Sequence, residues 1–524
     1  MKKISAILFA LMATTALLFV SCAPKELTAD TADFIMSNGS EPTLDPSLMT
    51  DVPSTNVGLG LFEGLMQYDP VTSKGTPALA ESYTVSEDGL TVTFKLRKAQ
   101  WSDGHPVTAG DFVYSMKRIL DPATGAEYAY MPAMVIKGAA DFNAGTGSFD
   151  QVGIKAIDDQ TLEYTLTGPA PYFVDMTAHN AFWPVPQWAI EKSGTEWTKP
   201  ENIVTNGPFV LREWKPQEYI FMVKNAKYWD AKSVKLRGIK ILASDNDSTN
   251  YNMFKDGSVD WMHGIALSKI DEIKLRPDYQ CSAQLATAYY CLNNTRAPVN
   301  NPLVRKALSA AIDRQTLVDK VRKGGQVPAE SWVPAMEGYT PQNGQGYNVE
   351  EAKKLLAEAG YPNGKGFPTL TIVYNTNEGH KAIAEYIQQQ WKDNLGINVT
   401  LKNMEFKTFI DLRSKQHDFT ICRHGWVGDY LDPNTMLDLF ITGGGNNDGL
   451  YSNPEYDRLI EAAKTAKGAD RMAILQKAEA ILMGDQGLIP LYHDTNQDLI
   501  DTSKWGGWSA NPIGFHPWKY IYRK

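Results

Sequence analysis

Charged and aromatic side chains gather between residues 418 and 440, directly after a short apolar run. The group consists of Arg423, His424, Gly425, Trp426, Asp429 and Tyr430. A fixed carboxylate and a fixed guanidinium beside aromatic faces can hold a small molecule that carries both charges. Asp432 and Pro433 then form a turn that opens an amphipathic segment. The same side chains could instead form salt bridges at the end of a strand, so the rest of the chain must decide between the two interpretations.

The composition limits the classes of function that these residues can serve. The 524 residues carry a net charge of -9 and contain no basic run, which argues against a nucleic acid as partner. The chain has no H-E-x-x-H, G-x-S-x-G or P-loop motif and no spaced metal-binding cluster among its 8 His. We therefore expect no enzyme, no metal and no cofactor, although dispersed carboxylates leave a catalytic site open as an alternative.

The N-terminus has the pattern of an export signal. Lys2 and Lys3 precede an apolar run from residue 4 to residue 20, which is short for a membrane span. The run ends in Leu18-Phe19-Val20-Ser21-Cys22, which resembles a bacterial lipoprotein signal. We predict a signal peptide over 1–21, lipidation of Cys22 and a polar spacer over 22–33; a plain signal peptide followed by a chance Cys is the alternative. No later segment is apolar enough to span a membrane, so lipid would tether a soluble body.

Three cysteines remain after the predicted lipidation. They are Cys281, Cys291 and Cys422, an odd number, so at most one disulfide can form. We expect Cys291 to pair with Cys422.

The pattern of apolar residues predicts both α and β elements. Residues 90–97 alternate between apolar and polar, which predicts a half-buried strand, and residues 108–120 predict an amphipathic helix. Asn348 caps a further helix, with Glu351 at the third helical position and Gly360 at the end. A strand, a helix and a strand then follow over 369–374, 381–391 and 397–401. This alternation indicates an α/β lobe late in the chain.

Short motifs in a fixed order give the whole mature chain a resemblance to the oligopeptide-binding proteins of ABC importers, in the peptide- and nickel-type family of large solute-binding proteins. The motifs are Leu44-Asp45-Pro46, Phe62-Glu63-Gly64-Leu65, Pro77-Ala78-Leu79-Ala80-Glu81-Ser82, Trp101-Ser102-Asp103-Gly104, Ala109-Gly110-Asp111-Phe112, Asn206-Gly207-Pro208-Phe209, Val304-Arg305-Lys306-Ala307-Leu308 and residues 426–433. One such motif is weak alone, but their order and spacing are specific.

The resemblance implies a mixed α/β fold with two lobes and three domains, and a ligand buried between the lobes. Lobe I would be discontinuous, built from 34–62, 187–285 and 496–524. An extra domain II would span 63–186, and lobe III would span 286–495. The lobes would close on a short peptide and present it to the permease subunits of an ABC transporter, and we expect the chain to act as a monomer in the bacterial cell envelope.

The resemblance also assigns roles to residues of the opening stretch. Gly425-Trp426-Val427-Gly428-Asp429 matches a G-W-x-x-D pattern in which the Asp, here Asp429, meets the peptide's amino terminus. The backbone of His424, Gly425 and Val427, with Val52 opposite, would pair with the peptide. The remaining positions that match family binding residues are Tyr128 near the first peptide units, Arg413, Arg423, Arg322 and His380 for carboxylates, and Phe406, which stands where close relatives have Trp.

Relatives in the same binding class carry dipeptides, nickel complexes, haem or sugars, so these ligands remain alternatives. Asp429 together with several basic residues favours a peptide, because a zwitterion has both charges to satisfy. A surface adhesin or interaction lipoprotein is the third possibility that the lipid anchor permits.

Overall fold

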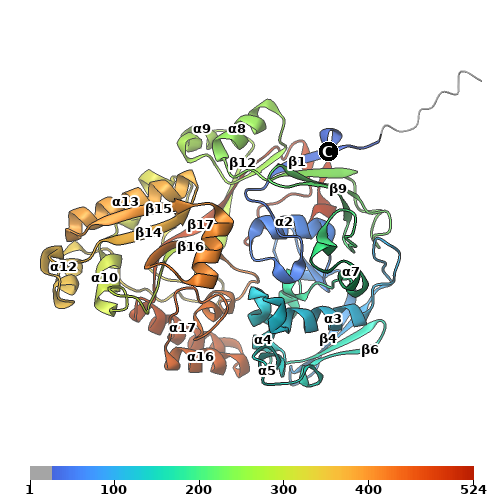
Figure 1. The fold of residues 1–524 in the computed structure, drawn as a ribbon, viewed down its shortest axis with the longest axis horizontal. Helices are drawn as coiled ribbons and strands as arrows, with labels where there is room; N and C mark the ends of the chain where they lie inside the picture. The colour runs from blue at the N-terminus through green and yellow to red at the C-terminus, as the bar shows by residue number, and fades with distance from the viewer. Residues whose placement is uncertain (1–25) are drawn as a thin grey trace, which may run out of the picture.

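Two long antiparallel strands run between the two halves of the molecule (Figure 1). They are β12 (Tyr279–Leu292) and β17 (Leu488–Ile500). The computed structural model describes residues 26–524, so the predicted signal peptide, Cys22 and the start of the spacer, 22–25, lie outside the described residues. Within those residues, no helix is both long and apolar enough to cross a lipid bilayer.

In residues 26–524, β12 and β17 form the centre of an eleven-stranded sheet. Its strands, in spatial order, are β15 (Val399–Met404), β14 (Leu370–Asn375), β16 (Ile421–Val427), β12, β17, β11 (Trp261–His263), β1 (Phe34–Ser37), β10 (Gly238–Leu242), β9 (Tyr219–Lys224) and β8 (Phe209–Lys215), with β13 (Val327–Pro328) paired to β17. One half of the sheet therefore uses strands from residues 34–263, and the other half uses the α/β segment.

Smaller sheets complete the strand structure of the described chain. Their members are β4 (Ala80–Val85), β5 (Thr91–Leu96), β7 (Thr161–Thr165) and β6 (Ile154–Asp158) in one sheet, β2 (Met66–Tyr68) with β3 (Gly75–Pro77), and β18 (Trp505–Gly506) with β19 (Tyr522–Arg523). In the β4–β7 sheet, β5 buries Val92, Phe94 and Leu96 and turns the intervening side chains outward, which confirms the predicted alternation.

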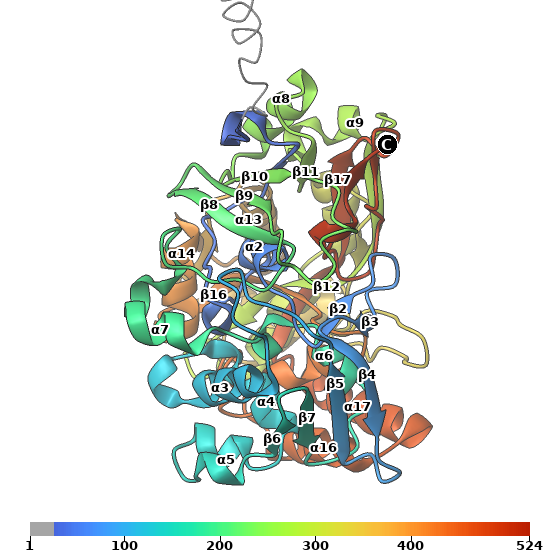
Figure 2. The ribbon, with the colours of Figure 1, turned by 90° about the vertical axis from the view of Figure 1, so that its right-hand side faces the viewer.

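Helices cover the sheets on both sides of the crossing strands. Those of the first half are α2 (Val52–Leu61), α3 (Ala109–Leu120), α4 (Tyr130–Val135), α5 (Ala139–Asn143), α6 (Phe173–Met176), α7 (Gln187–Ser193), α8 (Asp247–Asp256) and α9 (Ile270–Ile273). Those of the second half are α10 (Pro302–Ala310), α11 (Arg314–Thr316), α12 (Val349–Glu358), α13 (Glu378–Leu395), α14 (Phe406–Ile410), α15 (Asn434–Leu437), α16 (Pro454–Thr465) and α17 (Gly468–Gly484). Figure 2 shows α3, α4, α5 and the β4–β7 sheet at the end of the molecule opposite α8 and α9.

Local sequence signals explain where the α/β elements begin. The side chain of Asn348 accepts a hydrogen bond of 3.0 Å from the backbone N–H of Glu351, as the capping pattern predicted. Helix α13 begins three residues before the predicted start and ends at Leu395, with Gly396 in the left-handed region at φ 71°. Buried residues of α10, α12, α13 and β14 form one apolar core in this half of the molecule.

Two sequence-based predictions are wrong. Residues 434–440 do not form an amphipathic segment: they are two short helical turns that are buried on every side, because neighbouring elements cover both faces. Cys291 and Cys422 lie opposite each other in the β12–β16 ladder, yet both thiols are free, as is Cys281. The predicted disulfide is therefore absent from the structure. Burial raises the pKa of the Cys291 thiol, which disfavours the reactive thiolate.

Candidate functional site

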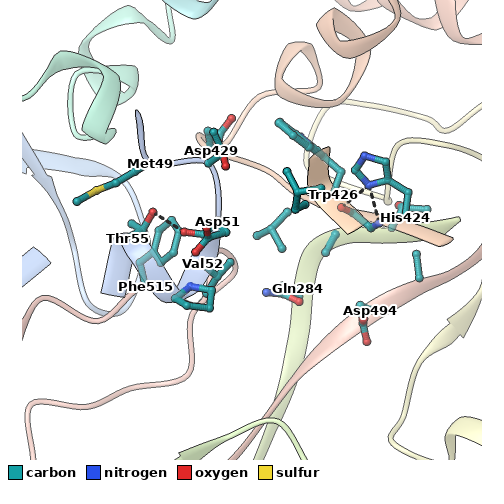
Figure 3. A pocket seen from close by; sticks show the side chains of 18 of the residues that line it. Met49, Asp51, Val52, Thr55, Gln284, His424, Trp426, Asp429, Asp494 and Phe515 are labelled. Atoms are coloured by element: carbon teal, nitrogen blue, oxygen red, sulfur yellow. Dashed lines mark hydrogen bonds between the residues drawn. The ribbon is translucent and has the colours of Figure 1, made fainter. Parts of the chain in front are cut away.

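A cavity of about 250 Å³ lies between the two lobes, beside the crossing strands. Figure 3 shows Val52 and Phe515 on one side of it, Trp426 and His424 on the other, and Gln284 and Asp494 on the crossing strands. The predicted site residues that line it are Val52, Tyr128, Phe406, Arg413, Arg423, His424, Gly425, Trp426, Val427 and Asp429. The structure therefore brings together ten of the twelve predicted ligand-binding residues from four separate segments.

Asp429 is a buried carboxylate without a cation. It follows strand β16 and is only 5% exposed. The Tyr128 hydroxyl donates a hydrogen bond of 3.4 Å to its Oδ1, and Nε2 of His179 lies 3.4 Å from the same oxygen. Its other oxygen, Oδ2, has no hydrogen-bond partner in the described residues. A buried polar atom of this kind is rare in folded proteins and needs an explanation.

The electrostatics of Asp429 follow from this burial. Loss of water raises its pKa to about 8, and the hydrogen bond from Tyr128 offsets only part of that rise. Burial also lowers the pKa of His179 to about 3, so the imidazole is neutral and supplies no counter-charge. A cation placed against Oδ2 would satisfy both the free oxygen and the negative charge.

Several hydrogen bonds hold Asp429 in place. Its backbone N–H donates to Thr435 Oγ1 at 2.9 Å, and the Trp426 indole N–H donates to the Thr435 carbonyl oxygen at 2.8 Å. The hydroxyl of Tyr68 donates to the Asp429 carbonyl oxygen at 3.3 Å. The ring of Trp426 also stacks on Tyr128, with centroids 6.3 Å apart and planes 19° apart. Thr435 and Tyr68 therefore hold the backbone of Asp429, and Tyr128 holds its carboxyl group.

One edge of strand β16 is free where it lines the cavity. Strand β12 pairs with β16 along its whole length, from Ile421 to Val427. On the other edge, β14 pairs only with Ile421 and Cys422, and no other described strand pairs with residues 423–427 there. Backbone groups on such an edge can pair with an added extended chain.

The second side of the cavity comes from the start of helix α2. Val52 occupies its first turn, and Asp51 caps it by accepting a hydrogen bond of 2.8 Å from the backbone N–H of Ser54. Burial raises the pKa of Asp51. Phe406, at the start of α14, also borders the cavity.

Arg413 and His424 are engaged with a carboxylate of the protein itself. Nε of Arg413 lies 2.5 Å from Asp448 Oδ2, and Nε2 of His424 lies 3.0 Å from the same oxygen. Burial opposes ionisation of Asp448, but the positive charge of Arg413 and the His424 hydrogen bond outweigh it and lower its pKa to about 2. This ion pair occupies the Arg413 side chain.

Arg423 differs from Arg413 because no carboxylate forms an ion pair with it in residues 26–524. Burial and the positive charges of Arg413 and Arg322 lower its pKa. Its Nη2 would lie 3.3 Å from a Cβ added at Gly425, so the glycine leaves room for the guanidinium. The alternative of a salt-bridged strand end therefore holds for His424, which contacts Asp448, and not for Arg423 and Asp429, which pair neither with each other nor with another Lys, Arg, Asp or Glu in the described chain.

Arg322 and His380 lie outside the main cavity. Arg322 lines a second cavity of about 160 Å³, where its Nη2 is 4.0 Å from Asp494 Oδ1 and its guanidinium is 5.3 Å from the Tyr492 ring centroid. His380 lines neither cavity, and burial together with Arg423 and Arg322 holds the pKa of its imidazole well below the usual value.

Sequence reasoning missed several cavity residues. They are His179, Asp51, Gln284 and Asp494, which line the main cavity; Tyr68, which does not line it but bonds the Asp429 backbone, was missed as well. Asp51 carried a usable signal, because Asp three residues before Ser is a helix N-cap pattern. The other four stand in no motif, and only the folded chain brings them to the cavity.

Comparison with known proteins gives a consistent result. The family model for the middle region of bacterial extracellular solute-binding proteins, family 5, matches residues 74–448. The chain is 37% identical over 532 residues to the periplasmic oligopeptide-binding protein OppA of Salmonella typhimurium, covering 99% of this chain and 96% of that protein.

Two crystal structures illustrate the similarity in three dimensions. An oligopeptide-binding protein of Borrelia burgdorferi matches with a TM-score of 0.91 at 40% identity, covering 94% of this chain and 99% of the other. The Haemophilus influenzae OppA complex with the peptide RPPGFSPFR matches with a TM-score of 0.88 at 34% identity, covering 94% and 98%. These matches confirm the predicted two-lobed mixed α/β fold. The chain belongs to family 5 of the bacterial extracellular solute-binding proteins.

Proposed function

We propose that this protein is the extracytoplasmic solute-binding component of an ABC importer and that it captures short oligopeptides in an extended conformation. The observation that carries the proposal is Asp429, a buried carboxylate with a free oxygen, at one end of an unpaired strand edge that has the uncompensated Arg423 at its other end. A zwitterion with a hydrogen-bonding backbone between its charges fits all three features.

The amino terminus of the peptide would meet Asp429. A desolvated ammonium needs a fixed counter-charge, and its three N–H groups can donate to Oδ2 and its neighbours. Tyr128 and His179, which already contact Oδ1, would hold the carboxylate while the ammonium approaches. Because the pKa of the empty site is about 8, binding at neutral pH would release the Asp429 proton.

The backbone of the peptide would add to the free edge of β16. Four residue steps separate Val427 from Arg423, roughly 13 Å at about 3.3 Å per residue. A peptide of about four residues could therefore place its ends near both charged groups. Main-chain hydrogen bonds would supply affinity without reading the side chains, and Val52 would face the peptide from the opposite lobe.

The peptide carboxylate would meet Arg423. Arg413 is a weaker candidate than the sequence suggested, since Asp448 already neutralises it. Arg322, in the second cavity, and His380, which lines neither cavity, are not assigned the carboxylate of a short peptide.

The lobes would close around the peptide by bending at β12 and β17. We propose that lobe I comprises 34–62, 187–285 and 496–524, with 63–186 as domain II and 286–495 as lobe III. Contacts between domain II and lobe III support a closed arrangement: Tyr172 stacks on Tyr430 at 5.0 Å, and the guanidinium of Arg471 lies 4.9 Å from the Tyr172 ring centroid.

The cellular setting completes the proposal. Lipidated Cys22 would tether the monomer to a membrane of the bacterial envelope, facing the periplasm or the exterior, and residues 22–33 would serve as the spacer. The permease subunits of the importer would receive the peptide. No catalytic role is assigned to any residue.

Isothermal titration calorimetry with tri-, tetra- and penta-alanine tests the proposal. Each peptide is compared with its N-acetylated and C-amidated forms. We expect tight binding of the free peptides, loss of binding on acetylation and weaker binding on amidation. Equal binding of acetylated peptides would rule out the role of Asp429. No binding of any peptide, with a dipeptide, nickel complex, haem, sugar or partner protein bound instead, would reject the ligand class.

A further inference from the structure

The second cavity adjoins the main one, with two residues between them. Gln284 and Asp494 line both cavities, and Arg322 lines only the second. The second cavity thus begins where the proposed peptide slot ends, near the carboxylate end. A ligand longer than the slot would have to enter it.

A break in the strand ladder puts Asp494 at this junction. In the β12–β17 pair, Ala283 is opposite Thr495 and Thr287 is opposite His493, so three residues of β12 face the single residue Asp494. An irregularity of this kind redirects side chains out of the regular alternation. On the opposite strand, the backbone N–H of Leu285 donates to Pro512 at 2.7 Å instead of to β17. Figure 3 shows Asp494 and Gln284 on these two strands beside the pocket.

Hydrogen bonds hold the Asp494 carboxylate in place. Its Oδ1 accepts hydrogen bonds from the Thr495 backbone N–H at 2.9 Å and from Gln326 Nε2 at 3.2 Å. Nη2 of Arg322 lies 4.0 Å from the same oxygen. The Asp494 side chain is 27% exposed, so it keeps access to the cavities. Asp494 is also the only carboxylate residue that borders the second cavity within the described chain.

We propose that Asp494 determines ligand specificity by keeping a carboxylate out of the second cavity. This inference rests on the peptide-binding function proposed above. Asp494 faces Arg322 at 4.0 Å, whereas Arg423 forms no ion pair with a carboxylate in the described residues. A peptide short enough to end at Arg423 is accepted. A longer peptide with a free C-terminal carboxylate meets Asp494 beside Arg322, and the two like charges repel each other at short range in a partly desolvated site.

The ligand preferred by this arrangement is a short peptide with a free carboxylate. A longer peptide is disfavoured by its terminal charge and not by its length alone. Amidation of the C-terminus should therefore have opposite effects on the two classes: it removes the partner of Arg423 for short peptides and removes the repulsion from Asp494 for long ones.

Calorimetry on the purified wild-type protein and on Asp494→Asn tests this inference with alanine peptides of three to seven residues, as free acids and as C-terminal amides. In the wild type, we expect amidation to weaken the binding of peptides of three to five residues and to strengthen the binding of those of six and seven. Asp494→Asn, which keeps the shape of the side chain, should raise the affinity of the longer free acids at least tenfold. It should change their amides less than twofold.

Two further variants make the result specific. Asp245→Asn controls for net charge, because it removes an exposed carboxylate that borders neither cavity. It should leave the dependence of affinity on peptide length unchanged. Asp494→Asn combined with Arg322→Gln should still bind long free acids more tightly than Arg322→Gln alone, because the Asp494 charge no longer repels the ligand carboxylate. Thermal melting of each variant establishes that it is folded.

The outcomes separate this inference from the function beneath it. If no alanine peptide binds to the wild type, the proposed function fails. Peptides could bind while Asp494→Asn leaves the dependence of affinity on peptide length unchanged, or raises the affinity of free acids and amides equally. In either case Asp494 does not act through its charge, and this inference is overturned.

Discussion

At one end of the cavity a single carboxylate, Asp429, is buried with neutral partners, whereas at the other end arginines lie beside carboxylates of the same chain. Arg413 faces Asp448 at 2.5 Å and Arg322 faces Asp494 at 4.0 Å, while Arg423 has no such partner. In the proposed binding mode, the amino terminus of the peptide would depend on this one carboxylate. Internal counter-charges would decide which of the arginines is available to the carboxylate of the peptide.

This difference has a physical origin. A lone buried carboxylate can avoid its charge by taking up a proton, as the raised pKa of Asp429 indicates. An arginine cannot lose its proton in the same way, so a buried guanidinium needs a permanent partner or access to water. The site at Asp429 can thus stay empty at low electrostatic cost, whereas the arginine end stays balanced through Asp448 and Asp494.

The largest expected effect is at the amino end. Asp429→Asn keeps the shape of the side chain but leaves the peptide ammonium without a counter-charge, so binding of tri-alanine should weaken about a hundredfold or more. Calorimetry gives the affinity, and N-acetylated tri-alanine should bind the variant no worse than it binds the wild type. A loss of less than tenfold would contradict the role of Asp429.

The same variant should alter the stability of the empty protein in a pH-dependent way. The folded pKa of Asp429, about 8, lies above its ordinary value of 3.8, so folding favours the protonated form and stability falls as the pH rises between the two values. Asp429→Asn removes this pH-dependent loss of folding stability, because asparagine does not ionise. Its melting temperature without ligand should exceed that of the wild type at pH 8, and the difference should shrink toward pH 5.

The two neighbouring arginines offer a sharper contrast. Arg423→Gln should weaken free tetra-alanine roughly tenfold to fiftyfold and leave its amide unchanged, because the lost bond is to a charged ligand group. Arg413→Gln should instead destabilise the fold by about 3 kcal/mol, because it leaves the Asp448 charge buried and unpaired. Calorimetry and urea denaturation measure the two quantities. If Arg413→Gln lowered affinity with no loss of stability, the division between the two residues would be wrong.

Proton release gives a test of the amino end that needs no mutation. A free carboxyl with a pKa of about 8 must ionise when the ammonium binds, so affinity should rise about tenfold between pH 6 and pH 7. The rise should stop near pH 8, where the α-amino group itself loses its proton. Calorimetry in buffers of different ionisation enthalpy counts the released protons. Asp429→Asn should show a flat profile over the same range.

A local pattern in the sequence was enough to predict the candidate binding residues that stand close together in the chain. The sequence did not reveal partners that are distant in the chain and meet only in the fold. Asp429, Trp426 and Arg423 stand within seven positions of one another, so a short motif could reveal them. Asp448 lies 35 positions after Arg413, and no spacing rule links an arginine to a carboxylate at that distance. The ion pair between Arg413 and Asp448 could therefore not be predicted from the sequence and is known only from the structure.

The same reasoning applies to elements of the fold. The helix capped by Asn348 and the alternating strand over 91–96 depend on neighbouring residues and were predicted well. The burial of residues 434–440 depends on the elements that pack against them. Their polar side chains predicted a solvent-exposed face, but all seven residues are buried. The register break at Asp494 arises because Leu285 bonds to Pro512 and to Gly428, two residues far from it in sequence.

The smallest expected effect comes from Tyr128→Phe. The hydroxyl donates to Asp429 Oδ1 at 3.4 Å and lowers the pKa of the carboxyl, so its removal should raise that pKa further. Ionising Asp429 then costs more at neutral pH, and tri-alanine should bind roughly threefold to tenfold more weakly. At pH 8 the loss should be smaller, because more of the carboxyl is already ionised. A loss that stayed constant from pH 6 to pH 8 would mean that Tyr128 contacts the peptide directly and does not act through Asp429.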